Sequence, residues 1–297
     1  SEPALERRQG CGGGGPGGGG AGRAGARVRQ AEEGDPPARL QALPLQVPLR
    51  MNGFLAKVTG RGTTELRDPL GSEAERSAAR LPLGIPAASV RFTRRPDVVM
   101  VLIESLRADF FDSLTMPRLA LRAEQGSVFA RHYAAASSTH YTLFSIFFGL
   151  QSQKLDAVIG SGHAPLLFGA LKANGYRMRL LAASSVNWMG MKATVFGDVL
   201  GELETDYHGI GATRDSAMVA HAEAWVTAAD TTPVFVMLFF DGTHFNYTYP
   251  PRSARFAPVW EGGSSVKAAR VAPELILRRA RNAAYEVDWK LGDFLTW

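Results

Sequence analysis

The chain has 297 residues, of which 45% are hydrophobic and 21% are charged, so it can bury one large core or two smaller ones. Its formal net charge is +5, and the basic residues form no Lys/Arg stripe with interleaved aromatic residues, which argues against nucleic acid as a partner. The single cysteine, Cys11, excludes an intrachain disulfide and a cysteine-based metal site.

Three regions differ in composition. Residues 1–38 are mostly Gly, Arg, Ala and Pro without periodicity, and we predict a disordered leader. Residues 39–95 contain short apolar patches broken by Pro and Gly, with one candidate helix at 72–80, and we interpret them as a linker. From residue 96 to residue 297, strand and helix signals alternate, which predicts a layered α/β domain.

The first strand expected in this domain, at 98–103, is a continuous apolar run rich in β-branched residues, which is typical of a strand buried on both faces of a parallel sheet. Two more strands are predicted at 176–182 and 234–240. Proline near the first turn, glycine at the end and helical spacing of apolar residues together predict helices. These lie at 116–125, 139–148, 164–174, 215–229 and 273–297.

No segment has the ~18 to 20 consecutive apolar residues that a transmembrane helix needs. The amino terminus also lacks the charged and apolar regions of a signal peptide. The chain begins at Ser1 rather than Met and stops at Trp297 inside a predicted helix, so we interpret it as a fragment of a longer protein.

Two polar residues stand where open α/β sheets place their sites. Glu104 follows the first strand, and Thr139 opens a helix after Ser137 and Ser138. A carboxylate at Glu104 suits a metal ligand, although it could equally be a solvated residue at a strand end. The Thr139 hydroxyl would lie among unpaired backbone N–H groups that stabilise an oxyanion, but it would need a metal to become a good nucleophile. The alternative is that Thr139 is only a capping residue.

A third polar group follows the last predicted strand, in the loop Asp241-Gly-Thr-His244. His244 could bind substrate oxygens there, or it could merely close a turn. Because the carboxyl ends of parallel strands meet at one edge of the sheet, this loop is expected on the same edge as Glu104.

These segments resemble a known family. The run 97–109 (DVVMVLIESLRAD) and the stretch 116–150 around SSTHYTLFS are similar to the sulfatase-like branch of the alkaline phosphatase superfamily, notably bacterial inner-membrane sulfatase-like proteins and lipoteichoic acid synthases. Further similarity lies at 234–250 (VFVMLFFDGTHFNYTYP) and at 278–295. Together the similar segments cover roughly 95–297.

The resemblance implies a three-layer α/β/α fold with a mainly parallel sheet and a site for a divalent cation such as Mn, Mg, Zn or Ca. Glu104 would match the acidic metal ligand, and Thr139 the nucleophile that also contacts the metal. His244 would match the histidine that holds substrate oxyanions, while Asn187 and Trp188 fall in a region that lines the substrate pocket in relatives.

Two departures from the family pattern change the expected chemistry. The formylglycine motif C/S-x-P-x-R of true sulfatases is missing, which disfavours sulfate-ester hydrolysis and favours transfer or hydrolysis at phosphorus, of the phosphoglycerol or phosphoethanolamine type, on a lipid or glycan ester. The family also supplies a later Asp-His metal pair, and the sequence stops at Trp297 before any such pair. We therefore expect the carboxyl-terminal part of the fold to be missing and the fragment to be inactive alone.

The resemblance also implies that the full-length protein is membrane-associated through segments absent from this sequence, with an extracytoplasmic catalytic domain. Two alternatives remain open. The protein could be a non-catalytic lipid-binding or regulatory membrane protein on the same fold, since a fold alone does not determine function. It could also be a soluble phosphodiesterase, if the complete gene encodes no upstream membrane helices.

Overall fold

The computed structural model describes residues 86–160, 164–228 and 231–297. The predicted leader at 1–38, the candidate helix at 72–80 and most of the predicted linker therefore lie outside the described residues. Within the described ranges, no helix is both long enough and apolar enough to cross a bilayer.

In the described part of the chain, four parallel strands form a sheet in the order β1, β4, β2, β3. The predicted strands are present as β1 (Val98–Ile103), β2 (Arg177–Ala182) and β4 (Val234–Phe240). Every residue of β4 is buried, as its continuous apolar sequence requires for a central strand. The fourth strand, β3 (Leu203–Glu204), was not predicted, because two residues are too short for a periodic signal.

All five predicted helices are present. The segment that becomes α10 starts four residues earlier than predicted, at Gly211, and the short helices α7, α9 and α11 were not predicted. In chain order the helices are α5 (Pro117–Ala123), α6 (Thr139–Phe148), α7 (Leu155–Gly160), α8 (Leu166–Ala173), α9 (Met191–Thr194), α10 (Gly211–Thr227), α11 (Ser265–Ala268) and α12 (Pro273–Thr296).

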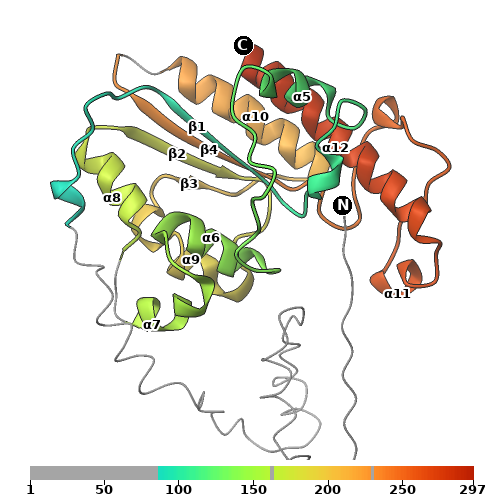
Figure 1. The fold of residues 1–297 in the computed structure, drawn as a ribbon, viewed down its shortest axis with the longest axis horizontal. Helices are drawn as coiled ribbons and strands as arrows, with labels where there is room; N and C mark the ends of the chain where they lie inside the picture. The colour runs from blue at the N-terminus through green and yellow to red at the C-terminus, as the bar shows by residue number, and fades with distance from the viewer. Residues whose placement is uncertain (1–85, 161–163, 229–230) are drawn as a thin grey trace, which may run out of the picture. The chain divides into compact units, whose positions relative to one another are not determined.

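The helices cover both faces of the sheet, which confirms the predicted three-layer α/β/α architecture with a parallel sheet (Figure 1). On one face, Phe147 of α6 and Phe168 of α8 lie 4.8 Å apart between ring centroids, and Phe168 contacts Phe235 of β4 at 6.4 Å. On the other face, Met218 of α10 and Leu291 of α12 share a buried cluster with alternate residues of β4. Alternate side chains of β4 therefore pack into two separate hydrophobic cores, one on each face of the sheet.

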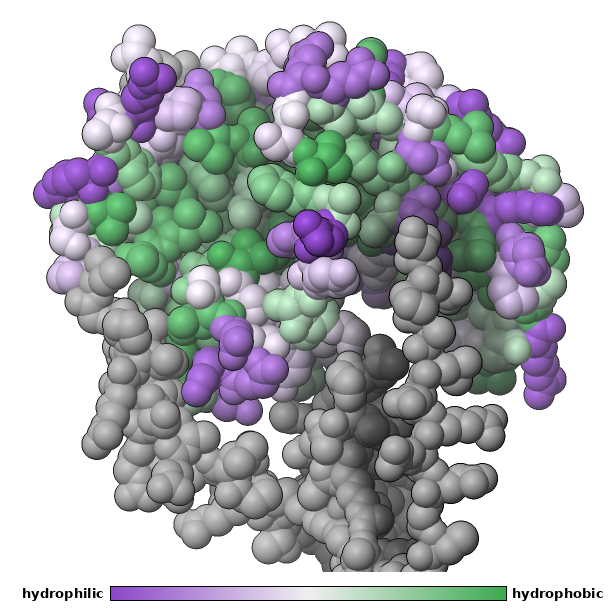
Figure 2. All heavy atoms as spheres, in the orientation of Figure 1, coloured by the Kyte–Doolittle hydropathy of each residue, from purple (hydrophilic) through white to green (hydrophobic). Residues whose placement is uncertain are grey.

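Apolar side chains are not confined to these cores. Hydrophobic residues are visible across a broad part of the face drawn in Figure 2, and hydrophilic residues lie mainly along its margins. Phe129 and Tyr133, in the segment between α5 and α6, are 77% and 81% exposed. Exposed single apolar residues are common in folded proteins, so we assign no binding role to these two residues.

A buried carboxylate joins α5 to α12. Asp288 of α12 accepts hydrogen bonds from the backbone N–H groups of Arg118 and Leu119, at 3.0 and 2.8 Å. These N–H groups lie in the first turn of α5, where no intrahelical acceptor exists, so Asp288 caps α5 from another helix. Burial raises the pKa of Asp288, and the two hydrogen bonds partly oppose that effect.

Removing this cap should destabilise the fold. We expect Asp288→Ala to lower the free energy of unfolding by about 1–3 kcal/mol, because two buried N–H groups lose their acceptor. The matched control is Asp293→Ala on the same helix, whose 69% exposed side chain pairs with Arg118 and should contribute less than about 1 kcal/mol. Urea unfolding of both variants measures the difference, and equal losses would contradict the capping role.

Candidate active site

Glu104 lies at the carboxyl edge of the sheet, directly after β1. Its backbone N–H donates to the Phe240 carbonyl at 3.1 Å, and its own carbonyl accepts a hydrogen bond from the Thr243 hydroxyl at 2.5 Å. The end of β4 and the loop that follows it therefore hold the Glu104 backbone from both sides. This anchoring fixes where the carboxylate can reach.

Thr139 is the first residue of α6, and the structure brings it to Glu104. The Thr139 hydroxyl oxygen is 3.1 and 3.2 Å from the two carboxylate oxygens of Glu104, across 35 positions of sequence. The two residues that the sequence singled out as an acid and a hydroxyl are thus directly hydrogen-bonded, with the hydroxyl as donor.

The start of α6 adds a favourable electrostatic environment for an anion. The ten-residue helix begins after Ser138, whose side chain makes no capping hydrogen bond. The first backbone N–H groups of a helix have no intrahelical acceptor, and the helix dipole is positive at this end. Negative charge that develops on a group next to Thr139 is therefore stabilised.

A groove of about 330 Å³ opens at this place. We call it the Glu104 groove. Its walls come from the end of β1, from the segment before α6 and from the first turns of α6, so both candidate residues face the same space. The lining residues include Glu104, Ser105, Leu106, Ser137, Ser138 and Thr139.

Trp188 lies beside the first turn of α6 but is not among the residues that line the Glu104 groove. Its ring makes an edge contact with His140 at 5.4 Å between centroids, and the His140 Nδ1 is 3.0 Å from the Ser138 hydroxyl. Trp188 is 53% exposed, so part of its ring can meet a ligand. Asn187 is exposed and precedes the 3-10 turn Trp188–Gly190. His140 follows Thr139 on α6, and neighbouring residues of a helix point in different directions. For this reason His140 was not predicted as a site residue, and the sequence could not show its contacts with Ser138 and Trp188.

His244 is not placed in the Glu104 groove. Its backbone takes part in two successive turns, donating to the Asp241 carbonyl at 2.8 Å and accepting from the Tyr247 N–H at 2.6 Å. The imidazole is exposed, with Nδ1 3.1 Å from the Phe245 carbonyl oxygen. The neighbouring Thr243, which was not predicted as a site residue, is the residue of this loop that contacts Glu104.

The loop itself is anchored by a buried acid. Asp215 of α10 accepts hydrogen bonds from the backbone N–H groups of Asp241 and Gly242, at 2.7 and 2.9 Å. A side chain at Gly242 would place its Cβ 2.6 Å from Asp215 Oδ2, so only glycine allows this approach. Burial raises the pKa of Asp215 to about 7, and the charge of Asp241 acts in the same direction.

Glu104 and Thr139 supply two oxygen donors, of the type that Mg²⁺, Mn²⁺ and Ca²⁺ prefer. In the part of the chain that the structure describes, no group of three or more His, Cys, Asp or Glu side chains is arranged to hold a metal. The donor chemistry therefore fits a hard divalent cation, while the described residues provide only part of a coordination shell.

Comparison with protein families identifies the domain. The family model described as Sulfatase matches residues 96–297, which is the region that holds the sheet and the Glu104 groove. The chain belongs to the sulfatase family. This confirms the resemblance seen in the DVVMVLIESLRAD and SSTHYTLFS segments.

Sequence relatives of this sulfatase-family chain include membrane proteins. The inner membrane protein YejM of Salmonella typhimurium is 25% identical over 142 residues, which are 48% of this chain and 24% of YejM. An uncharacterized protein of Haemophilus influenzae is 24% identical over 159 residues, which are 52% of this chain and 27% of that protein. The similarity thus spans about a quarter of the length of these relatives.

Solved structures with the same fold include phosphoethanolamine transferases. The integral membrane protein EptA of Neisseria meningitidis superposes with a TM-score of 0.54 at 17% identity, covering 82% of this chain and 48% of EptA. The periplasmic domain of EptC from Campylobacter jejuni gives a TM-score of 0.51 at 13% identity, covering 68% of this chain and 63% of that domain. At such identities the likeness establishes the fold alone.

Proposed function

We propose that this chain carries part of a metal-dependent phosphoryl-transfer site with Thr139 as the nucleophile. The observation that carries the proposal is the hydrogen bond from the Thr139 hydroxyl to both oxygens of Glu104, at the positive end of α6. The fold shared with enzymes named phosphoethanolamine transferases supports phosphorus as the reaction centre. The substrate we propose is a lipid or glycan phosphoester.

Each residue of the candidate site would have a separate role in the reaction. Glu104 orients the Thr139 hydroxyl, and the first N–H groups of α6 bind the phosphoryl oxygens. Attack forms a bond between Thr139 Oγ1 and phosphorus and releases the alcohol of the ester. Water or a glycolipid hydroxyl then attacks the same phosphorus and frees Thr139. The family resemblance implies oxyanion binding by His244 and an outer substrate wall formed by Asn187 and Trp188, but none of these three residues lines the Glu104 groove, so these roles require a substrate that extends beyond it.

A divalent cation would be held by Glu104 and Thr139 together with further donors from outside the described residues or from water. When bound, it would lower the pKa of the Thr139 hydroxyl and neutralise charge on the phosphoryl oxygens. The names of the relatives, an inner membrane protein and a periplasmic transferase domain, support a membrane-associated protein whose catalytic domain lies outside the cytoplasm.

A second candidate function is a non-catalytic lipid-binding or regulatory membrane protein on the same fold. The observation that favours it is the small number of metal donors in the described part of the chain. Detection of a covalent intermediate distinguishes the two functions, because a non-catalytic protein forms none.

The direct test is to trap that intermediate. The full-length protein is incubated with Mn²⁺ and vesicles that contain phosphatidylethanolamine, quenched in acid, digested and analysed by mass spectrometry. We expect a phosphoethanolamine or phosphate adduct on the peptide that contains Thr139. Adducts on another residue would overturn the assignment of the nucleophile, and the absence of any adduct would favour the non-catalytic alternative.

Glu104 can be tested through thermal stability. If Glu104 is a ligand, adding Mn²⁺ or Mg²⁺ should raise the melting temperature of the complete domain, and Glu104→Gln should remove this response because an amide is a much weaker ligand. Glu124→Gln, at an exposed glutamate, is the matched control and should respond as the unmodified protein does. An undiminished response in Glu104→Gln would exclude Glu104 as a ligand.

A further inference from the structure

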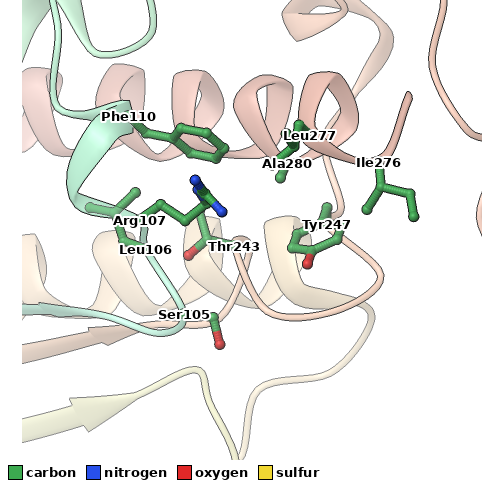
Figure 3. Close-up of a pocket in the computed structure, with 9 residues that line it drawn as sticks. All are labelled: Ser105, Leu106, Arg107, Phe110, Thr243, Tyr247, Ile276, Leu277 and Ala280. Atoms are coloured by element: carbon green, nitrogen blue, oxygen red, sulfur yellow. The ribbon is translucent and has the colours of Figure 1, made fainter. Parts of the chain in front are cut away.

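A second cavity lies beside the Glu104 groove. It has a volume of about 90 Å³ and is bounded by α12, by the segment that follows β1 and by the loop after β4 (Figure 3). We call it the α12 cavity. Its lining includes Ser105 and Leu106, which also line the Glu104 groove, so the two spaces adjoin. A ligand group in the α12 cavity would therefore lie close to a molecule bound next to Thr139.

The walls of the α12 cavity are mostly hydrocarbon. Phe110, from the 3-10 turn Ala108–Phe110, and Ala280 of α12 are only 3% and 5% exposed. Leu106, Ile276 and Leu277 complete the apolar lining. Such walls favour a ligand group that gains by leaving water, namely an uncharged hydrocarbon group.

Two polar groups at the edge of this cavity, on Arg107 and Thr243, have partners. The Arg107 guanidinium, which reaches toward the middle of the view in Figure 3, donates two hydrogen bonds to Asp109, at 2.8 and 2.9 Å. The Thr243 hydroxyl donates to the Glu104 carbonyl. Because the charge of Arg107 is matched by that of Asp109 and most of the lining is apolar, an uncharged hydrocarbon group suits the cavity better than a second anion does.

The backbone around the cavity is held in an unusual conformation at two places. Ser105 and Tyr247 both have a φ of 57°, in the left-handed region that residues other than glycine rarely adopt. Both residues line the α12 cavity. Strained residues of this kind persist where the surrounding structure determines them, and they concentrate at ligand-binding sites.

We propose that the α12 cavity binds a short, uncharged alkyl segment of the phosphoester whose phosphorus is attacked by Thr139. This inference rests on the proposed function, which places the phosphoryl group in the adjoining Glu104 groove. It makes the cavity a specificity site: esters whose hydrocarbon part enters the cavity bind more tightly than esters too small to reach it.

Two simple esters test the proposal. Methyl phosphate and n-butyl phosphate are titrated into the full-length protein by calorimetry in the same magnesium-containing buffer. Because each buried methylene contributes roughly a factor of four to affinity, we expect n-butyl phosphate to bind at least about tenfold more tightly. Ala280→Leu fills the cavity and should remove this preference without weakening methyl phosphate.

The control makes the same substitution elsewhere. Ala220→Leu, at an exposed position of α10, should keep the preference for n-butyl phosphate. If Ala280→Leu does not fold, Ile276→Ala removes part of the wall instead and should also reduce the preference. Equal affinities for the two esters, binding of neither, or a preference that survives in both cavity variants would overturn the proposal.

The result is distinguishable from a failure of the proposed function. A Thr139 adduct together with equal affinities would overturn the cavity proposal alone. A preference for n-butyl phosphate that Ala280→Leu removes, in a protein that forms no adduct, would retain the binding site while overturning the assigned chemistry.

Discussion

In the full-length protein, Thr139→Ala should reduce turnover of a phosphoester by at least about 10³-fold, because it removes the atom that would form the covalent intermediate. The free energy of unfolding should change by only about 1 kcal/mol, the usual contribution of one hydrogen bond, since the lost contact is the one to Glu104. Steady-state kinetics and urea unfolding on the same preparation separate the two effects. A large loss of activity with a nearly unchanged fold is the expected result.

The matched control for Thr139 is its neighbour Ser138. Ser138→Ala also removes a hydroxyl from the Glu104 groove, and it breaks the contact with His140 Nδ1. We expect this variant to keep most of its activity, because the Glu104 carboxylate is hydrogen-bonded to Thr139 rather than to Ser138. If Ser138→Ala lost as much activity as Thr139→Ala, the serine would have to be considered as the nucleophile. Full activity in Thr139→Ala would exclude the threonine.

The parts of the fold that could be predicted are those whose signals are local. The bounds of β1 and β4 agree with the prediction because each strand is an unbroken apolar run between polar residues. The start of α10 could not be predicted in the same way. Its first turn, Gly-Ala-Thr-Arg, contains no large apolar residue that would mark a helix, and the Ala212 N–H there is capped by the Thr248 hydroxyl, 36 positions away.

The same distinction between local and distant signals applies to the residues of the candidate site. Glu104 and Thr139 could be located from a strand end and a helix start, and the parallel topology explains why they meet. The supports of the site could not be found this way, because Thr243 reaches Glu104 across 139 positions and Asp215 reaches the loop from α10. Sequence spacing carries no information about such contacts. It also could not show that the His244 side chain is exposed on its turn.

We expect the stability of the fold to vary with pH because of Asp215, the buried acid that anchors the loop after β4. The pKa of this buried carboxyl is about 7 in the folded chain, against 3.8 for a free side chain. Below about pH 4 both the folded and the unfolded state carry the proton. Between about pH 4 and pH 7 only the folded state keeps it, so the free energy of unfolding falls as the pH rises. Above pH 7 this contribution is lost.

Across this window the loss amounts to about 4 kcal/mol, at 1.36 kcal/mol per pKa unit. Asp215→Asn cannot titrate, so its stability relative to the unmodified protein should improve steadily as the pH rises from about 4 to about 7. Asp198→Asn, at an exposed aspartate, is the control and should show the pH dependence of the unmodified protein. Urea unfolding at several pH values measures all three proteins.

The groups around Asp215 explain why this residue should cause the change of unfolding free energy with pH. Burial is the largest influence and raises the pKa of Asp215, and the hydrogen bonds from the Asp241 and Gly242 N–H groups lower it. The Asp241 carboxylate raises this pKa and the Lys290 ammonium lowers it, and neither neighbour is altered by Asp215→Asn. A pH dependence that persists in Asp215→Asn would therefore assign the titration to another group. If it disappears, the carboxyl that holds the Asp241 and Gly242 N–H groups is protonated at neutral pH or just below it. The loop that supports Glu104 would then be held by a neutral acid rather than by a buried charge.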